Sequence, residues 1–203
     1  MLRRKPPTSI VEYDILAGAA GSAPPIGRGH TNMDTHERYR DYIITDATEA
    51  DAGPLASLLR ESFADVAERF GLTPENAPTH PSNCTPGWIH SAFAKRVRYY
   101  LMQGPQGPVG CVALEHAEAE VCYLGRLAVL PPFRGRGLGK ALVDHVMEKA
   151  RELDVRRVEL GIISADAGLR EWYEKLGFSA TSAAQFKHLP FEVTFMRKVL
   201  SSR

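Results

Sequence analysis

The chain has 203 residues, of which 44% are hydrophobic and 24% charged, as in ordinary globular proteins. This length allows one sizeable hydrophobic core or two small ones. Basic residues number 25 and acidic residues 24, and residues 1–33 hold a surplus of two positive charges, so the remainder is close to neutral. So little net charge projects no broad basic field, which argues against nucleic acid as the main partner.

The cysteines and the apolar pattern predict a cytoplasmic protein. Cys84, Cys111 and Cys122 form no even framework and no C-x-x-C pair, which fits a reducing compartment. No apolar run approaches the ~20 residues of a membrane helix, and we expect neither a signal peptide nor membrane association. His80, Cys84 and His90 match no standard zinc spacing, so no metal is expected.

Residues 1–40 are rich in Pro, Gly and Ala without periodicity, and they predict a flexible extension before one domain over 41–203. The domain begins with a short strand at residues 42–45. Leu and Phe residues at helical spacing then predict a helix that is interrupted near Ser62 and ends at Gly71.

Residues 72–87 hold four prolines and no periodicity, which predicts a long structured loop or a lid. A short helix is expected over residues 88–95. The next two apolar runs, 97–102 and 109–114, are joined by a Gly- and Pro-containing turn and predict a hairpin.

A long apolar strand is predicted over residues 121–130. It ends at Pro131, because proline has no N–H to donate to a neighbouring strand. An amphipathic helix follows, because apolar residues recur at every fourth position: Leu138, Leu142, Val146 and Ala150. Residues 157–163 alternate as a strand does, so strand, helix and strand make a crossover whose two strands run parallel.

The remaining residues predict a helix over 167–176, ended by Gly177, and a closing antiparallel pair over 178–186 and 191–199. Antiparallel strands before and after a central parallel unit indicate a mixed α/β sheet. No internal repeat is evident.

The segment between the central strand and its helix reads Arg134-Gly135-Arg136-Gly137-Leu138-Gly139-Lys140. A glycine-rich turn that enters a helix directs backbone N–H groups and the positive end of the helix dipole at one point, which suits a phosphate or pyrophosphate. A Walker loop is excluded, because Ala141 follows Lys140 where Ser or Thr is needed. A dinucleotide fingerprint from Gly135 is excluded too, because it needs glycine at position 140. A plain strand–turn–helix connection is the alternative.

The pattern R-x-x-G-x-G, formed by Arg134, Gly137 and Gly139, resembles the acyl-CoA loop of the GNAT N-acetyltransferase superfamily. The segment WYEKLGF, residues 172–178, is similar to the end of the last helix in these enzymes. The two motifs occur in the right order around a β-α-β unit, and the resemblance is strong over residues 110–180. It implies a GNAT-type mixed, mostly antiparallel sheet with a central parallel β-α-β unit that is splayed and flanked by helices.

The resemblance implies acetyl-CoA as cosubstrate, with its pyrophosphate on the loop backbone from Arg134 through Gly135, Arg136, Gly137, Leu138 and Gly139 to Lys140. The side chains of Arg134 and Arg136 would add positive charge or point to solvent. The pantetheine arm would lie beside three residues of the central strand: Leu127, Ala128 and Val129. The central strand must then separate from its parallel neighbour, and a bulge near Gly125-Arg126 would cause this. Asp166, also assigned to cofactor binding, replaces the asparagine of many members.

The resemblance further implies that a neutral primary amine attacks the thioester directly in a ternary complex. An alkyl ammonium has a pKa near ~10.4 and must first lose a proton. Tyr173 matches the general acid that protonates the leaving thiolate, although it also fits a half-buried helix aromatic. The N–H of Val129 would donate to the oxyanion. The base stays open between Glu120, Tyr123 (where several members have glutamate), a water chain and a residue of region 60–95.

The acceptor is expected to be an amine-bearing small molecule or peptide, and the sequence does not identify it. The alternative function, from a different class, is a catalytically silent GNAT-fold acyl-CoA sensor or partner-binding module. A homodimer is compatible with both functions.

Overall fold

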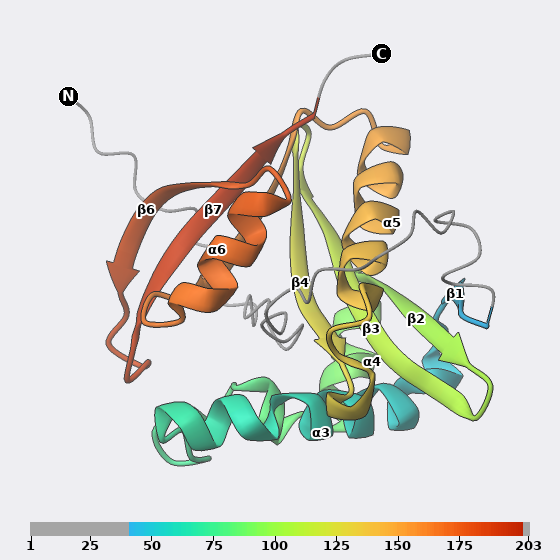
Figure 1. Ribbon diagram of the computed structural model, residues 1–203, viewed down its shortest axis with the longest axis horizontal. Helices are drawn as coiled ribbons and strands as arrows, with labels where there is room; N and C mark the ends of the chain where they lie inside the picture. Colours follow the sequence, from blue (N-terminus) through green and yellow to red (C-terminus); the bar gives the residue numbers. More distant parts are fainter. Residues whose placement is uncertain (1–40, 201–203) are drawn as a thin grey trace, which may run out of the picture.

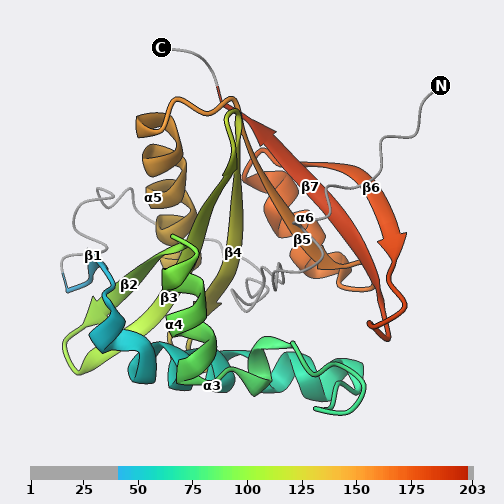
Figure 2. The same ribbon diagram turned by 180° about the vertical axis from the view of Figure 1, so that it is seen from behind.

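The computed structural model describes residues 41–200, and the predictions for residues 1–40 lie outside this range. A twisted seven-stranded sheet has helices on both faces, as Figure 1 and the reverse view in Figure 2 show. The strand order is β1-β2-β3-β4-β5-β7-β6. The strands are β1 (Ile43–Asp46), β2 (Arg98–Gly104), β3 (Gly107–Glu118), β4 (Val121–Val129), β5 (Arg157–Ile163), β6 (Ser179–Gln185) and β7 (Glu192–Val199). The α-helices are α3 (Ala52–Phe70), α4 (Pro86–Ala94), α5 (Leu138–Glu152) and α6 (Ala167–Lys175).

Among the described strands, β4 and β5 form the one parallel pair, and every other neighbouring pair is antiparallel. The predicted mixed sheet is therefore confirmed. Parallel pairing is short: it joins Val121–Tyr123 to Arg157–Glu159 and stops there. Beyond Tyr123 the two strands diverge, as Figure 1 shows, and this confirms the predicted splay.

A β-bulge in β4 accompanies the divergence. Cys111 of β3 is opposite Ala128, whereas Ala113 is opposite Gly125, so β4 holds one extra residue in this interval. Arg126 has a φ of 51°, in the left-handed region that non-glycine residues seldom adopt. The bulge predicted near Gly125-Arg126 is present.

The bulge changes the face of the sheet to which the side chains of β4 point. Cys122 and Leu124 belong to the core beneath α5 and α6, and after the bulge Leu127 and Val129 belong to it. Ala128 instead packs in the core on the other face, beneath α3 and α4. Because side chains alternate along a strand, one inserted residue shifts every later side chain to the opposite face. Arg126 is thereby turned toward α4.

Helix α3 is continuous from Ala52 to Phe70, so the break predicted near Ser62 was wrong. Ser62 is fully buried on the same face as Leu59 and Phe63, which shows that it belongs to the apolar face. Helical geometry continues there because the side chains that follow Ser62 keep the same spacing of three and four. The predicted end at Gly71 is confirmed, with a φ of 61°.

The region expected as a loop, residues 72–87, contains a short 3-10 helix, η2 (Pro81–Asn83), and the first turn of α4. Helix α4 begins at Pro86, earlier than the predicted residue 88, because proline at the first helical position lacks only an N–H that has no helical acceptor. A further 3-10 turn, η1 (Glu49–Asp51), precedes α3, and Thr48 and Asp51 form a capping box there.

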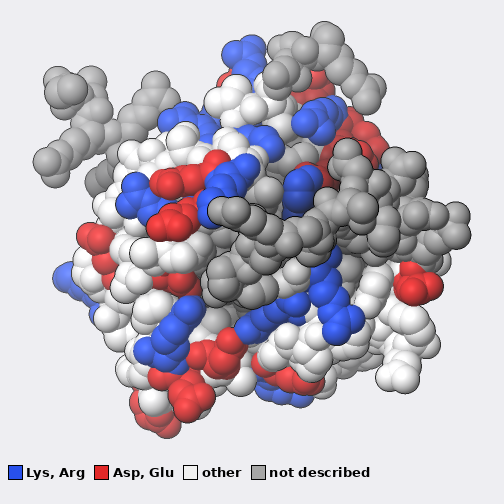
Figure 3. Space-filling model, in the orientation of Figure 1, with Lys and Arg blue, Asp and Glu red and all other residues white. Residues whose placement is uncertain are grey.

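On the face that Figure 3 shows, basic and acidic side chains are intermingled, in keeping with the nearly balanced composition. Within residues 41–200, none of the helices is both long enough and apolar enough to span a bilayer.

Candidate active site

The glycine-rich turn lies between η3 (Pro131–Phe133) and the first residue of α5. Gly135 and Gly137 have φ values of 74° and 85°, where a Cβ would be strained. The first helical hydrogen bond runs from Ala141 N–H to the Gly137 carbonyl at 3.1 Å. The N–H groups of residues 138–140 precede it and have no intrahelical acceptor. The turn therefore presents backbone donors at the positive end of the α5 dipole.

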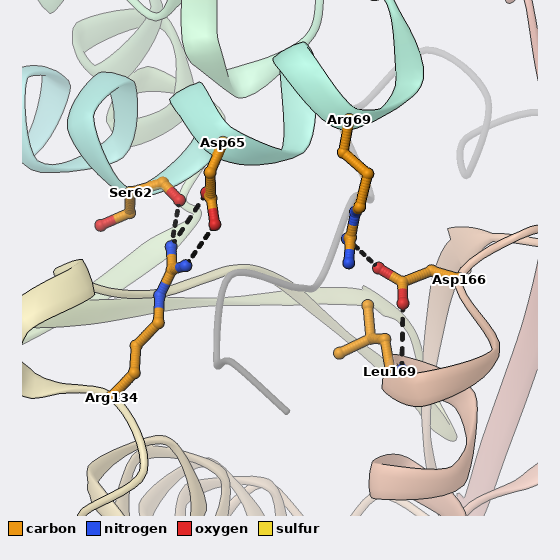
Figure 4. Close-up of polar contacts among 6 residues, drawn as sticks. All are labelled: Ser62, Asp65, Arg69, Arg134, Asp166 and Leu169. Carbon is orange, nitrogen blue, oxygen red and sulfur yellow. Dashed lines mark hydrogen bonds and ion pairs between the residues drawn. The ribbon is translucent and has the colours of Figure 1, made fainter. Parts of the chain in front are cut away.

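The side chain of Arg134 does not project to solvent or toward these donors. It is only 15% exposed, and its guanidinium reaches α3, as Figure 4 shows. Nη1 donates to Asp65 Oδ2 at 2.5 Å, and Nη2 donates to the Ser62 carbonyl at 2.5 Å and to Asp65 Oδ1 at 3.2 Å. Nε donates to the Val129 carbonyl at 3.0 Å. Arg134 thus connects the turn to both α3 and β4. Because its guanidinium is engaged in these bonds, its backbone is the part available to a ligand.

The other two basic side chains of the turn make local contacts. Arg136 donates to the Pro132 carbonyl at 3.0 Å and lies over the ring of Phe133 at 5.4 Å. Lys140 pairs with Asp144 at 2.5 Å on the exposed side of α5. Exposed contacts of these two kinds contribute little to stability. The side chains of Arg136 and Lys140 can therefore reorient toward an anion at small cost.

The end of β4 presents backbone groups to the gap. Leu130 donates to the Val109 carbonyl at 2.9 Å, and Val129 lies opposite Gly110. In an antiparallel ladder this makes Val129 and Gly110 a non-hydrogen-bonded pair, so the N–H and C=O of Val129 point away from β3. Ala128, opposite Cys111, takes the hydrogen-bonded position, and its backbone points to β3. The backbone N–H and C=O groups of Leu127 and Val129 therefore point into the gap between β4 and β5, and those of Ala128 do not.

Tyr173 of α6 is fully buried in the same core as Leu127 and Val129. Its ring packs edge-on against Trp172 at 4.8 Å and Phe178 at 5.4 Å between centroids. The hydroxyl is buried and has no hydrogen-bond partner among the described residues. Burial raises the pKa of this phenol well above its usual value, so the hydroxyl stays protonated at neutral pH. A buried donor without an acceptor costs about 1–3 kcal/mol, and a bound group would recover that cost.

Asp166 is the N-cap of α6 and accepts from Leu169 N–H at 3.1 Å. Its other oxygen accepts from Arg69 of α3 at 2.5 Å, as Figure 4 shows. Both carboxylate oxygens are therefore engaged in holding α6. The predicted cofactor contact of Asp166 would compete with these bonds.

A pocket of about 360 Å³ lies on the α4 face of the sheet, beside the bulge. Its walls come from the residues before α4, from α4 itself, and from strands β2, β3 and β4. The lining residues are Pro78, Thr79, Trp88, Ser91, Ala92, Lys95, Val97, Tyr99, Ala113, Glu115, Tyr123, Leu124, Gly125 and Arg126. Aromatic walls with a few charged groups are typical of small-molecule sites.

Glu115 was missed by the sequence reasoning. It lies on β3 opposite Tyr123 of β4, and both side chains line the pocket. Burial raises the pKa of the Glu115 carboxyl, while the charge of Lys95 opposes this shift. A carboxyl with a raised pKa beside a gap in the sheet is suited to accept a proton. Glu115 is brought to the pocket by the register between β3 and β4. The alternation of residues 109–118 does not reveal that register, so the sequence alone did not identify Glu115.

Glu120 lies in the turn before β4, at the end remote from Val129. Its carboxylate pairs with Arg156 at 3.1 Å and Arg157 at 4.0 Å, and its backbone carbonyl accepts from both. The structure therefore brings Tyr123 to the pocket and leaves Glu120 outside it.

The described residues, 41–200, contain no cluster of three or more His, Cys, Asp or Glu side chains that would hold a metal ion. Cys84, Cys111 and Cys122 are buried thiols without a disulfide.

Comparisons with known proteins agree with this geometry. The sequence model of the acetyltransferase (GNAT) family matches residues 60–178. An uncharacterized N-acetyltransferase of Escherichia coli, YjgM, is 28% identical over 77% of this chain and 95% of its own length. Another, MJ1207 of Methanocaldococcus jannaschii, is 38% identical over 72% of this chain, which spans 64% of that relative.

The fold is also that of solved acetyltransferases. A putative acetyltransferase from Salmonella typhimurium, yncA, determined with acetyl-CoA, aligns with a TM-score of 0.60 and 16% identity, over 80% of this chain and 96% of that one. The predicted GNAT-type fold is confirmed by this similarity. Since the family match covers more than half of the chain, the protein belongs to the acetyltransferase (GNAT) family.

Proposed function

We propose that the protein is an N-acetyltransferase that transfers the acetyl group of acetyl-CoA to a primary amine. The observation that carries the proposal is the gap between β4 and β5, into which the Val129 N–H points. The glycine turn follows the same end of β4, and Tyr173 packs in the same core as Leu127 and Val129. Family membership and the acetyl-CoA in the yncA structure support the choice of cosubstrate.

The geometry suits acetyl-CoA at two points. The N–H groups of residues 138–140 suit its pyrophosphate, because glycines at positions 135 and 137 keep Cβ atoms out of the turn. The outward backbone groups of Leu127 and the outward N–H of Val129 suit the amide-bearing arm, which would extend the sheet as a short extra strand, while the Val129 carbonyl is held by Arg134. When bound, acetyl-CoA supplies an activated acyl thioester.

The residues around the gap suit the proton transfers of such a reaction. Glu115 lies opposite Tyr123, six residues along β4 from Val129, so it would take the ammonium proton through a water chain and leave a neutral amine. As the new C–N bond forms, the N–H of Val129 donates to the acyl oxygen. On breakage of the C–S bond, the Tyr173 hydroxyl would give its proton to the departing sulfur. The nitrogen would lose its second proton to solvent, Glu115 would release the first, and the tyrosine would take one back, so one proton leaves for each acetyl group transferred.

The test joins a binding measurement to a turnover measurement on the full chain. Acetyl-CoA should raise the melting temperature, because a ligand that binds the native state alone stabilises it. A screen of primary amines should then reveal at least one that releases free thiol from acetyl-CoA. Stabilisation without thiol release from any amine would favour the acyl-CoA sensor instead. The absence of both effects would refute both functions.

A further inference from the structure

We propose that the amine acceptor also carries a carboxylate, which Arg126 binds, so that the preferred acceptors are small amino carboxylates with an apolar portion. This inference rests on the proposed acetyl transfer. Three of the pocket residues are charged: Lys95, Glu115 and Arg126. Two cations and one carboxylate complement a ligand with an ammonium group for Glu115 and a negative group for the cations.

Arg126 is positioned in the pocket by the bulge of β4. In a regular strand it would share a face with Leu124, and the inserted residue turns it toward α4 instead. Only 5% of Arg126 is exposed, and its guanidinium carbon lies 5.7 Å from the ring centre of Trp88. A guanidinium oriented by an aromatic ring presents a rigid fork, which matches a carboxylate better than an ammonium does.

His80 provides a second, independent observation. Its exposed fraction is 2%, and it directly follows Pro78-Thr79 of the pocket wall. Its Nδ1 contacts Ser82 Oγ at 2.8 Å and accepts from Ser82 N–H at 3.3 Å, and the latter bond favours the tautomer with the ring proton on Nε2. Nε2 is buried and has no hydrogen-bond partner among residues 41–200. Burial, and then the charge of Arg126, lower the pKa of His80. A buried donor that directly follows the pocket wall along the chain suits the anion that Arg126 would bind.

The rest of the pocket constrains the acceptor further. Trp88, Tyr99 and Tyr123 supply aromatic walls, which favour an apolar portion of the ligand. A volume of about 360 Å³ is at the small end of the range for ligand pockets. A diamine would bring a second positive charge toward Arg126 and Lys95, so we expect it to be a poor acceptor.

The experiment compares three amines that share a benzyl group: phenylalanine, phenylalaninamide and phenethylamine. A parallel set comprises leucine, leucinamide and isopentylamine, and 1,4-diaminobutane is added as the diamine. Binding of each to the full chain is measured by calorimetry in the presence of CoA, and turnover is measured as thiol release from acetyl-CoA. We expect the carboxylates to bind at least tenfold more tightly than the amides and to have at least tenfold higher kcat/KM.

Variants then assign the preference to Arg126. Arg126→Asn keeps a residue that tolerates the left-handed backbone, and it should lower kcat/KM for the carboxylates at least tenfold with less than threefold change for the amides. Lys95→Gln, at the exposed rim, should reduce the same preference with little risk to folding. Arg151→Gln, a cation in the last turn of α5, is the control and should change neither.

The outcomes separate the two proposals. Thiol release without a preference for carboxylates, or with a preference for the diamine, overturns this inference and leaves acetyl transfer intact. Tighter binding of carboxylates without any thiol release supports the anion site and refutes acetyl transfer. A carboxylate preference that Arg126→Asn and Lys95→Gln both leave unchanged also overturns the inference.

Discussion

Asp65 and Arg69 lie one helical turn apart on α3 and hold opposite walls of the gap between β4 and β5 (Figure 4). Asp65 binds Arg134 of the glycine turn, and Arg69 binds Asp166 at the N-terminus of α6. Residues four apart lie on one face of a helix, so a single face of α3 braces both sides. The separation of the two walls therefore depends on α3, whose buried residues pack in the core between α3, α4 and the sheet.

Arg134 is predicted to contribute more to stability than the other cations of its turn. Arg134→Met removes the side-chain donor of the Val129 carbonyl and the ion pair with Asp65, so the free energy of unfolding should fall by about 2 kcal/mol. Acetyl-CoA should also stabilise this variant less, because the turn is no longer held. Arg136→Met, which loses an exposed hydrogen bond and the contact with the Phe133 ring, is the matched control and should cost under about 0.5 kcal/mol. Chemical denaturation of both variants measures the difference, and equal losses would contradict the bracing role.

Gly137 is predicted to affect both stability and cofactor binding. Valine at a φ of 85° is strained, so Gly137→Val should lower the free energy of unfolding by about 2 kcal/mol. Its side chain would also obstruct the turn, so the rise in melting temperature with acetyl-CoA should disappear. Gly71→Val provides the control, because Gly71 is also left-handed, has open space where a Cβ would lie, and ends α3 away from the turn. That variant should be destabilised similarly and still respond to acetyl-CoA. An undiminished response in Gly137→Val would remove the turn from the cofactor site.

Sequence patterns predicted the parts of the site that depend on neighbouring residues. Pro131 ends β4, the glycines open the turn, and apolar residues at every fourth position form α5. The separation of β4 from β5 was also predicted, together with the bulge in β4 that accompanies it. These features arise from local chemistry, which a sequence displays directly.

The parts that sequence did not predict depend on distant partners. Arg134 and Asp65 are 69 positions apart, and nothing near either residue indicates the other. Glu115 faces Tyr123 because of the register between β3 and β4, which shifts at two places, in the middle of β3 and near its end. A helix break was expected near Ser62, but its position on the buried face of α3 follows from packing against the sheet.

Tyr173→Phe separates the catalytic and packing roles of this tyrosine. We expect turnover to fall by about 10²-fold or more when the proton donor is lost, with acetyl-CoA affinity retained. Because the hydroxyl has no partner among residues 41–200, its removal should leave stability unchanged or raise it by about 1 kcal/mol. Tyr100→Phe, at a fully buried tyrosine of β2 that packs on His145, should leave turnover unchanged. Normal turnover in Tyr173→Phe would exclude the acid role.

Glu115 is predicted to control the acidic limb of the pH–rate profile. A base must be deprotonated, so kcat/KM of the wild type should fall as the pH drops through the raised pKa of this carboxyl. Glu115→Gln should lose about 10²-fold or more in rate and also lose that limb. Glu118→Gln, on the exposed end of β3, is the control. A limb that persists unchanged in Glu115→Gln would assign the base to another group.

The same shift has a consequence for stability. A carboxyl whose pKa is raised by folding holds more protons in the folded state, so stability falls as the pH rises from the unfolded pKa through the folded one. At neutral pH the wild type should therefore be less stable than Glu115→Gln, and the difference should vanish in acid. Urea denaturation of both proteins across this range measures it.

His80 should make the fold sensitive to acid over a different range. Burial, and then the charge of Arg126, lower its pKa from 6.5 to about 4. The folded state thus binds fewer protons than the unfolded chain between these values, and stability should fall as the pH drops from 6.5 to 4, by at most about 1.4 kcal/mol per pH unit. His80→Gln should lack this component, whereas His90→Gln, at an exposed residue of α4, should retain it. Parallel denaturation midpoints for the wild type and His80→Gln across this range would show that His80 is not held neutral by the fold.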